Sequence, residues 1–117
     1  MSKYSTVLVE GRSMEPTYFA GDWLMAQWGK FAVKSNKFSL GDLLGPRVAR
    51  GDVVVIERPE QPGIFYVKRV SETRSSAGEV PALFVLSDNS AGTDSRSWGW
   101  LPITSVRAKI AFRMKRG

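Results

Sequence analysis

The strongest constraint on the fold of this chain is a series of short β-type runs separated by turns that contain Gly and Pro. The β-branched run "GDVVVIE" (51–57) is followed by the turn "PEQPG" (59–63) and then by "IFYVKRV" (64–70), an order typical of a β-hairpin. Residues 106–115 alternate between apolar and mostly basic side chains, which is the period of a strand with one buried face. We expect the buried face to carry Val106, Ala108, Ile110, Phe112 and Met114, opposite Arg107, Lys109, Arg113 and Lys115.

The rest of the chain adds strands but no clear helix. Runs around 7–9, 21–28 and 82–88 predict three further strands, the last of them preceded by a polar loop at 71–81. Residues 29–50 are basic, contain Gly and are weakly periodic, which predicts a long excursion between strands. A length of 117 residues suits one domain, and the sequence shows neither an internal repeat nor a linker. We therefore predict a single all-β domain over residues 1–117.

The composition excludes several classes of site. Without Cys or His, the chain cannot form disulfides, use a thiol nucleophile or bind zinc or copper through nitrogen or sulfur. Its 11 acidic residues show no calcium-loop spacing, so we expect neither a metal nor a cofactor. The net charge of +6 predicts attraction to an acidic surface of lipid, nucleic acid or protein. Because no segment approaches the roughly 20 apolar residues of a transmembrane helix, we expect a soluble or peripheral protein, and the compartment stays open.

The stretch "VEGRSMEPTY" (9–18) places Ser13 in a setting that fits either a nucleophile or an ordinary turn serine. A serine hydroxyl becomes a good nucleophile only when a base removes its proton. The usual base is histidine, which this chain lacks, but Ser-Lys pairs also occur. A lysine can be that base only if burial lowers the pKa of its amine enough to keep it neutral. The candidate base is therefore a lysine on an apolar face.

Lys68 fits this requirement best. On a strand through 64–70 it shares one face with three bulky residues, Ile64, Tyr66 and Val70. The alternative is that Lys68 and the arginine after it form a solvated pair on an exposed strand, because lysines are rarely buried. Periodicity alone leaves both interpretations open.

Five sequence blocks extend over most of the chain. They are "GRSMEPT" (11–17), "GDWL" (21–24), "RGDVVVIERP" (50–59), "YVKRV" (66–70) and "SDNSAGTDSRSWGWLP" (87–102). Together, and in this order, they resemble the type I signal peptidase family of serine proteases, from about Val9 to the C-terminus. The resemblance implies an all-β fold with coiled sheets, a nucleophile at Ser13 and a lysine general base at Lys68. It also implies removal of N-terminal signal or pro-peptides after small residues, at Ala-x-Ala-like sites.

The resemblance further indicates how the oxyanion is stabilised. In the family one donor is the backbone N–H of the nucleophile, and a second can be a hydroxyl two residues earlier. That earlier position is Gly11 here, so a backbone donor or water must replace the hydroxyl. We expect the substrate-binding walls to come from residues 11–14 and 64–68. The residues assigned to oxyanion or substrate binding are Gly11, Arg12, Met14 and Tyr66.

The last block departs from the family pattern. The usual Gly-Asp-Asn reads Ser-Asp-Asn at 87–89, and the spacing from there to Asp94 is one residue shorter. The family places a serine near the lysine amine two positions before this Asp, and that position is Gly92 here. We expect Ser90 or Ser95 to substitute for it.

Asp94 and Arg96 match an ion pair that the family uses for structure. A surface ion pair contributes only about 0–1 kcal/mol, so we expect the pair to position its loop, although a solvated turn would look the same in the sequence. The residues assigned to support of the site are Asp88, Ser90, Asp94, Ser95 and Arg96.

The resemblance leaves the biological role open. Family members usually carry an N-terminal membrane anchor, and we expect none here because no segment of the sequence is long and apolar enough. A general signal peptidase and a dedicated maturation protease, similar to the one for nickel superoxide dismutase, both fit, and either is compatible with peripheral attachment to a membrane or to an anchor protein. Four tryptophans suit either a membrane surface or packing within the domain: Trp23, Trp28, Trp98 and Trp100.

Two other classes also remain. Self-cleaving repressors of the LexA type share a Ser-Lys dyad and a related fold, but they normally carry a DNA-binding part, and only a short segment precedes Ser13. A non-enzymatic β module would bind nucleic acid through the basic face of residues 107–116, but Phe112 alternates away from that face. We therefore expect a peptide, and not nucleic acid, as the partner.

Overall fold

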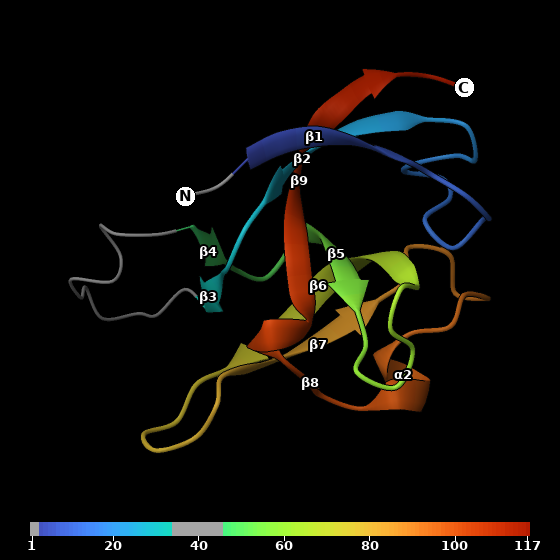
Figure 1. Cartoon of the computed structure of the whole chain (residues 1–117). Helices are drawn as coiled ribbons and strands as arrows, with labels where there is room; N and C mark the ends of the chain where they lie inside the picture. The colour runs from blue at the N-terminus through green and yellow to red at the C-terminus, as the bar shows by residue number, and fades with distance from the viewer. Residues whose placement is uncertain (1–2, 34–45) are drawn as a thin grey trace.

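The computed structural model describes residues 3–33 and 46–117, and most of its strands join one antiparallel sheet (Figure 1). The strand order is β1-β2-β9-β5-β6-β7-β8, so that β9, the last strand in the chain, returns to the middle of the sheet. This arrangement confirms the all-β prediction, including the hairpin formed by β5 and β6. The strands are β1 (Lys3–Leu8), β2 (Trp23–Trp28), β5 (Val53–Glu57), β6 (Phe65–Arg74), β7 (Ala82–Leu86), β8 (Leu101–Pro102) and β9 (Val106–Lys115).

Smaller elements complete the part of the chain that the structure describes. The short strands β3 (Ala32–Val33) and β4 (Arg47–Val48) pair in parallel. Helical structure in the described ranges consists of α2 (Ser95–Trp98) and the 3-10 turn η1 (Ile103–Ser105). Of the excursion expected at 29–50, residues 34–45 lie outside the described residues, and the two flanks form β3 and β4.

The sheet is curled because its central strand is irregular. In Figure 1, β9 runs from the layer of β1 and β2 down to the layer of β5 and β6. Its pairing shifts register twice against β2 and once against β5. Such β-bulges bend a strand and increase its twist. The coiled sheet implied by the resemblance is therefore present.

The β5 strand is buried on both faces and separates two apolar clusters. Val54 and Ile56 belong to one cluster, which includes the buried parts of β6, β7 and η1. Val53 and Val55 belong to the other, which includes Met14 and the buried parts of β2 and β9. A run of β-branched residues without polar alternation is typical of a strand in this position.

Two details of the sequence prediction were wrong. The β6 strand continues to Arg74, past the predicted end at residue 70, because its polar residues pair with β7 and keep one side in solvent. In β9 the expected buried face ends at Ile110, which lies opposite Ala26, whereas Phe112 lies opposite the outward-facing Met25. The extra residue between these pairs turns Phe112 outward, so it is 55% exposed. Met114 is exposed as well.

Candidate active site

Ser13 lies in a turn between β1 and β2, and the next residue, Met14, anchors this turn in the core. Met14 is 1% exposed and packs into the apolar cluster beneath β1 and β2. Its carbonyl accepts hydrogen bonds from the backbone N–H groups of Thr17 and Tyr18, both at 2.9 Å. Gly11 has a φ of +74°, a left-handed conformation that other residues rarely adopt, and this redirects the chain just before Ser13. The serine is thus presented on a rigid turn.

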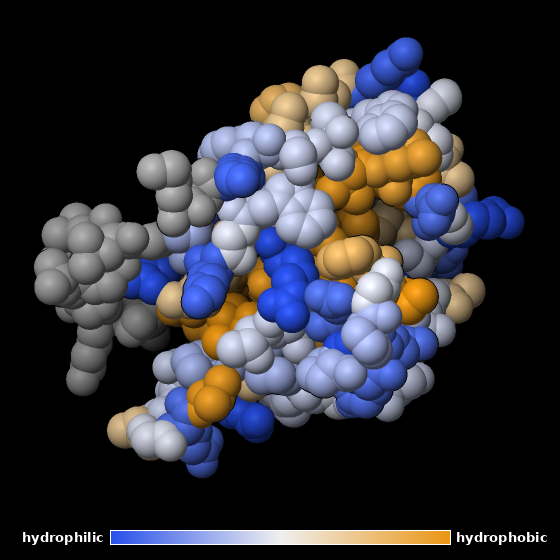
Figure 2. All heavy atoms as spheres, viewed as in Figure 1, coloured by the Kyte–Doolittle hydropathy of each residue, from blue (hydrophilic) through white to orange (hydrophobic). Residues whose placement is uncertain are grey.

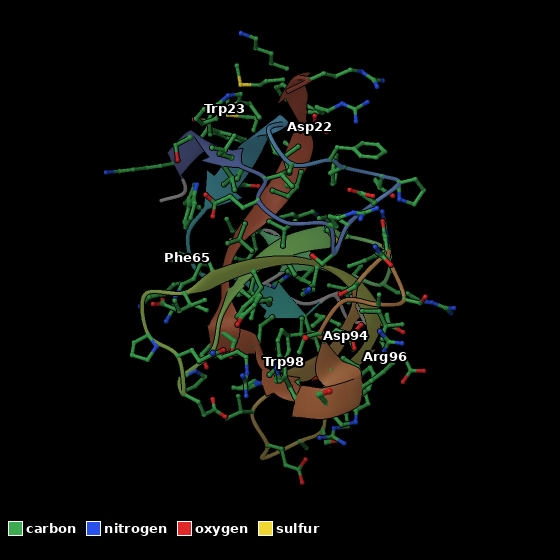
Figure 3. All side chains as sticks on the ribbon, turned by 90° about the vertical axis from the view of Figure 1, so that its right-hand side faces the viewer. Asp22, Trp23, Phe65, Asp94, Arg96 and Trp98 are labelled. Carbon is green, nitrogen blue, oxygen red and sulfur yellow. The ribbon has the colours of Figure 1, made fainter. Side chains whose placement is uncertain are left out.

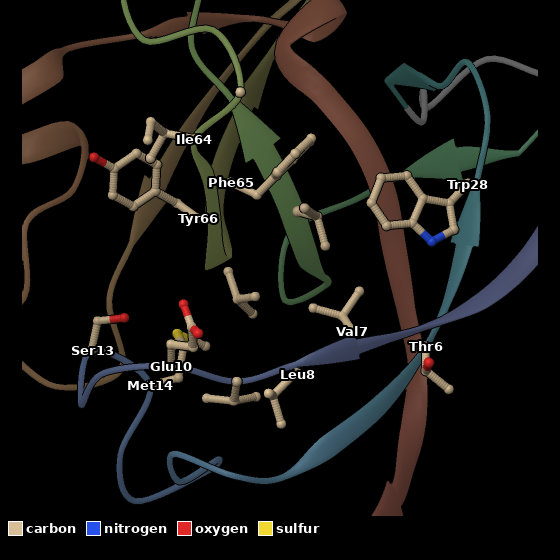
Figure 4. Close-up of a pocket in the computed structure, with 14 residues that line it drawn as sticks. Thr6, Val7, Leu8, Glu10, Ser13, Met14, Trp28, Ile64, Phe65 and Tyr66 are labelled. Atoms are coloured by element: carbon tan, nitrogen blue, oxygen red, sulfur yellow. The ribbon is translucent and has the colours of Figure 1, made fainter.

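Ser13 stands at one end of a groove of about 520 Å³ (Figure 4). One wall is β1 with the turn that follows it, and the other is the loop and strand at 63–67. Trp28 and Phe65 lie at the far end, where their rings pack edge to face with their centres 6.0 Å apart. Apolar residues gather along β1 and below it on this face in Figure 2. Because β1 is the last strand of the sheet, its outer edge has backbone groups available to an extended chain.

The residues predicted to bind substrate fall on two sides of Ser13. Met14 and Tyr66 line the groove, together with Ile64. Arg12 instead lines a second hollow of about 430 Å³, which also contains Ser13 and Gly92. The Arg12 side chain is largely exposed and pairs with a glutamate in its own turn.

Lys68 is almost completely buried, with 2% of its surface exposed. It lies opposite Val54 in the β5–β6 hairpin and therefore points into the apolar side of the sheet. Its amine nitrogen is 5.6 Å from the centre of the Tyr66 ring and 5.8 Å from that of Trp98. This burial lowers the pKa of Lys68, the nearby charge of Asp94 partly opposes the shift, and Arg96 adds to it. Of the two readings of the sequence, the solvated pair is excluded.

The hydroxyl that contacts Lys68 in the described structure belongs to Ser87. The Lys68 amine donates a hydrogen bond of 2.9 Å to the Ser87 Oγ. The two serines expected from the sequence have other contacts: the Ser95 Oγ accepts from the backbone of Val85, and the Ser90 carbonyl accepts from Arg96. The expectation of Ser90 or Ser95 as the lysine's partner was therefore wrong: Ser90 is exposed, Ser95 begins α2 with its hydroxyl bound to Val85, and the amine meets Ser87 at the end of β7.

Asp88 ties the Ser13 turn to the loop that follows β7. Its carboxylate accepts hydrogen bonds from Thr17 at 2.6 Å and from two nitrogens of Arg69 at 2.8 and 2.9 Å. The hydrogen bonds from Arg69 have the largest effect on the pKa of Asp88 and lower it. The bond from Thr17 lowers this pKa further, whereas desolvation raises it and only partly offsets the two. Asn89 adds a backbone bond of 2.8 Å to the Ser13 carbonyl and a side-chain bond to the Arg12 carbonyl. Segments 71 residues apart are thereby held together.

Asp94 and Arg96 clamp the other end of the same loop (Figure 3). Two nitrogens of Arg96 donate to the two Asp94 oxygens at 2.9 and 3.0 Å, and Arg96 also binds the carbonyls of Ser90 and Gly92. Asp94 is 1% exposed, caps α2 and accepts the backbone N–H of Ser87 at 2.8 Å. Desolvation raises its pKa, but the bonds from Arg96 and from these backbone groups outweigh it and hold the pKa below its ordinary value. The pair thus positions the loop that carries Ser87.

The loop packs directly against Ser13 at Gly92. A β-carbon built on Gly92 would lie 2.9 Å from the Ser13 Cβ and 2.8 Å from the Ser87 Cβ. Ser13 and Ser87 therefore face the same small space, and Ser87 connects it to Lys68. The Ser13 hydroxyl borders an apolar groove, and through Ser87 it lies near a buried amine with a lowered pKa, which is a combination suited to base-assisted nucleophilic attack.

Sequence reasoning missed three contributors to the site. Ser87 was noted only as a departure from glycine, although a polar residue at the end of an apolar strand was the available signal. For Trp98 the sequence left two roles open, packing within the domain and contact with a membrane surface. In the structure it packs on Tyr66 with the ring centres 5.0 Å apart, and it covers Lys68. Asn89, which binds the Ser13 turn, carried no signal beyond its place in the block.

The described ranges contain no group of three or more acidic, His or Cys side chains arranged to hold a metal ion. Among the helices of residues 3–33 and 46–117, none has the length and apolar character required to cross a membrane.

Comparison with known proteins supports the resemblance seen in the blocks. A search of curated proteins gave no match. A family model described as signal peptidase, peptidase S26, matches residues 1–73, which include the Ser13 turn and most of the hairpin with Lys68. This match covers well over half of the 117 residues, and the curled antiparallel sheet agrees with it. The chain therefore belongs to the signal peptidase family, peptidase S26.

Proposed function

We propose that the protein is a serine endopeptidase in which Ser13 is the nucleophile and Lys68 the general base. The observation that carries this proposal is the burial of Lys68, whose amine bonds to a serine that packs, across Gly92, beside Ser13. Lysines are rarely buried without a reason, and a chain without histidine needs another base. A lowered pKa allows the amine to be neutral and to accept a proton.

The reaction follows from these roles. The Ser13 Oγ attacks the carbonyl carbon of the scissile peptide bond while its proton moves to the Lys68 amine. The resulting oxyanion is stabilised by the backbone N–H of Ser13 and by a second donor that is not the side chain of residue 11, which is glycine. The protonated lysine then gives its proton to the leaving amine as the C–N bond breaks. Water attacks the acyl-enzyme with Lys68 again as base, which releases the acid product and restores Ser13.

The groove supports an extended peptide as substrate. An added strand could pair along the free edge of β1 and direct alternate side chains into the groove. Met14, Ile64 and Tyr66 are bulky and line the end near Ser13, so the pockets there are shallow (Figure 4). We propose cleavage after small residues, as in removal of signal or pro-peptides at Ala-x-Ala-like sites. A dedicated maturation protease for one protein is the alternative, and it would show the same chemistry with a narrower range of substrates.

A second surface supports peripheral contact with an anionic membrane. On the outer face of the sheet, Leu8 and Lys115 both lie opposite Trp23, and Phe112 lies opposite Met25. Leu8, Trp23 and Phe112 are exposed apolar residues, and basic residues end the chain beside them. Cosedimentation with anionic and neutral vesicles tests this: we expect binding to anionic vesicles that weakens with salt and in Trp23→Ser. Equal binding of Trp23→Ser and wild type would contradict it, as would preference for nucleic acid.

The proposed catalysis is tested by a peptide-cleavage assay. We expect wild type to cleave and Ser13→Ala, Lys68→Ala and Lys68→Arg to be inactive, the last because a guanidinium does not lose its proton in this pH range. Ser90→Ala and Lys109→Ala are matched controls that change the same residue types outside the dyad, and they should retain activity. Circular dichroism checks the fold of each variant. Activity in Lys68→Arg would exclude the lysine as base.

A further inference from the structure

We propose that Arg12 selects an acidic residue on the leaving side of the scissile bond, at the first or second position after the cut. This inference rests on the proposed function, because it concerns which peptides the Ser13 site accepts. It adds a requirement that the shallow pockets of the groove do not impose, since those pockets receive the residues before the cut.

Two hollows meet at Ser13. The groove of about 520 Å³ and the second hollow of about 430 Å³ are both lined by this residue. A peptide that has its scissile carbonyl at the Ser13 Oγ and its preceding residues in the groove therefore continues into the second hollow. The described lining of that hollow is Arg12, Ser13, Asn89, Ala91 and Gly92. The second hollow is thus the place for the residues that depart with the new amine.

The residues on either side of Gly11 place opposite charges in the two hollows. Glu10 lines the groove, whereas Arg12 lines the second hollow, whose other described lining residues are uncharged. An extended peptide that passes over Ser13 therefore meets a negative charge before the cut and a positive charge after it. Because complementary charges fix the register and the choice of partner, this polarity favours a carboxylate on the leaving side.

The backbone of Arg12 is fixed, while its guanidinium is accessible. The Arg12 carbonyl accepts a hydrogen bond of 3.0 Å from the Asn89 side chain. The Arg12 side chain is 79% exposed, and its Nε and one terminal nitrogen donate to the Glu15 carboxylate at 3.2 to 3.4 Å. These are its side-chain bonds within the described ranges, so the other terminal nitrogen can donate to a carboxylate of the substrate.

Glu15 sets the strength of this preference. An exposed ion pair such as Arg12–Glu15 is weak, so a carboxylate of the substrate can share the guanidinium with Glu15. The negative charge of Glu15 also repels that carboxylate. Removal of this charge should therefore increase the preference for an acidic substrate.

The test compares pairs of peptides that differ by one charge. Each peptide has Ala at the first and third positions before the cut, an amidated C-terminus, and Glu or Gln at the first or the second position after the cut. At low ionic strength, kcat/KM of wild type should be about 2- to 5-fold higher for Glu than for Gln at one of these positions, which is the range for an exposed ion pair. Salt at about 1 M, where the Debye length is about 3 Å, should remove the difference.

Variants assign this ratio to Arg12. Arg12→Gln should abolish the difference between the two peptides, Arg12→Glu should favour Lys over Gln at the same position, and Glu15→Gln should increase the preference for Glu. Arg116→Gln and Glu72→Gln are matched controls that make the same changes of charge at exposed positions outside the hollow, and they should keep the ratio of wild type. The ratio is the readout because a general effect on Ser13 acts on both peptides of a pair and cancels.

The outcomes separate the inference from the proposed function. Equal cleavage of the Glu and Gln peptides by wild type at low ionic strength refutes the role of Arg12 and leaves the dyad standing. A preference that persists in Arg12→Gln also refutes it, because another group then supplies the charge. If Arg12→Gln cleaves neither peptide, an equal ratio in Glu15→Gln and Glu72→Gln refutes it instead. Absence of Ser13-dependent cleavage of every peptide by wild type refutes the proposed function and the inference together.

Discussion

The amine of Lys68 and the hydroxyl of Ser87 lie 2.9 Å apart in a place where the lysine is 2% exposed. A buried lysine with a neutral partner costs stability, since burial penalises the charged form of the amine. The protein retains this cost at the point where the Ser13 turn meets the loop after β7. Local destabilisation of this kind is typical of functional sites.

The first prediction is that Lys68→Met makes the protein inactive but more stable. Met fills a similar volume without a charge, so the free energy of unfolding should increase by about 1–3 kcal/mol at neutral pH. The folded-state pKa of Lys68 lies below its unfolded value, so the penalty is full at low pH and disappears as pH rises past about 10.4. The gain in Tm should therefore shrink at alkaline pH.

Calorimetry from pH 6 to pH 10 measures this gain, where the range is chosen to reach about the unfolded pKa of lysine. Lys109→Met is the control: Lys109 is ion-paired with Asp52 at 3.2 Å, and its replacement should not stabilise. A lower Tm for Lys68→Met than for wild type at neutral pH would show that the buried amine is stabilising after all.

The second prediction concerns the pH dependence of catalysis. Only the neutral amine of Lys68 can accept the Ser13 proton, so kcat/KM should rise with pH through the lowered pKa of Lys68 and level off above it. No histidine is present to produce such a rise. Initial rates at low substrate concentration, with thermal unfolding followed at each pH, provide the profile. A value of kcat/KM that stays constant from acidic to strongly alkaline pH would exclude a titrating base.

The third prediction concerns specificity. Cleavage-site mapping by mass spectrometry on a diverse peptide library should find Ser13-dependent cuts after small residues, with bulky or charged residues disfavoured at the first and third positions before the cut. Ile64 lines the groove and is 49% exposed, so Ile64→Ala should admit larger residues with little loss of stability. Phe112→Ala, which removes a similarly exposed side chain elsewhere, is the control. Cuts clustered after Arg, Lys or aromatic residues would refute the substrate class but not the dyad.

The fourth prediction concerns the link between the Ser13 turn and the loop. Asp88→Asn weakens the bonds to Thr17 and Arg69, so we expect a loss of about 1–3 kcal/mol in unfolding free energy and a lower kcat. The pKa of Asp88 is depressed in the folded state, so its contribution is present above the ordinary pKa of Asp and is lost as pH falls through the folded value. The difference from wild type should therefore vanish in acid.

Urea titrations at neutral and acidic pH measure this difference, and Glu72→Gln, an exposed acid on β6, is the matched control. Asp88→Asn with wild-type stability at neutral pH would mean that the loop is held by its other contacts alone.

The sequence predicted the strands and the nucleophile turn better than the loop geometry. The run at 51–57 has no polar alternation, and β5 is indeed buried on both faces. The outward orientation of Phe112 could not be predicted from the sequence. It results from a bulge in β9, and a bulge depends on how this strand pairs with both β2 and β5. The burial of Lys68 also could not be predicted, since periodicity gives the face of a strand but not what covers it, and here the cover is Trp98, 30 residues later in the chain.

The partner of Lys68 was missed for a related physical reason. Loop residues are close or distant according to the path of the chain, and one residue fewer between Asn89 and Asp94 changes that path. The clamp of Arg96 on two loop carbonyls turns the Ser90 side chain toward solvent and brings Gly92 onto Ser13. Only the folded loop reveals that Ser87 fills the space.

The most direct test of the account is detection of the covalent acyl-enzyme. Wild type, Ser13→Ala and Lys68→Ala are incubated with an activated ester of a peptide that ends in Ala, quenched in acid and analysed by peptide mass mapping. The account predicts that wild type gains the mass of the acyl group on the peptide that contains Ser13, and that neither variant gains it. Acylation at another residue, or equal acylation of Lys68→Ala and wild type, would contradict the Ser13–Lys68 mechanism.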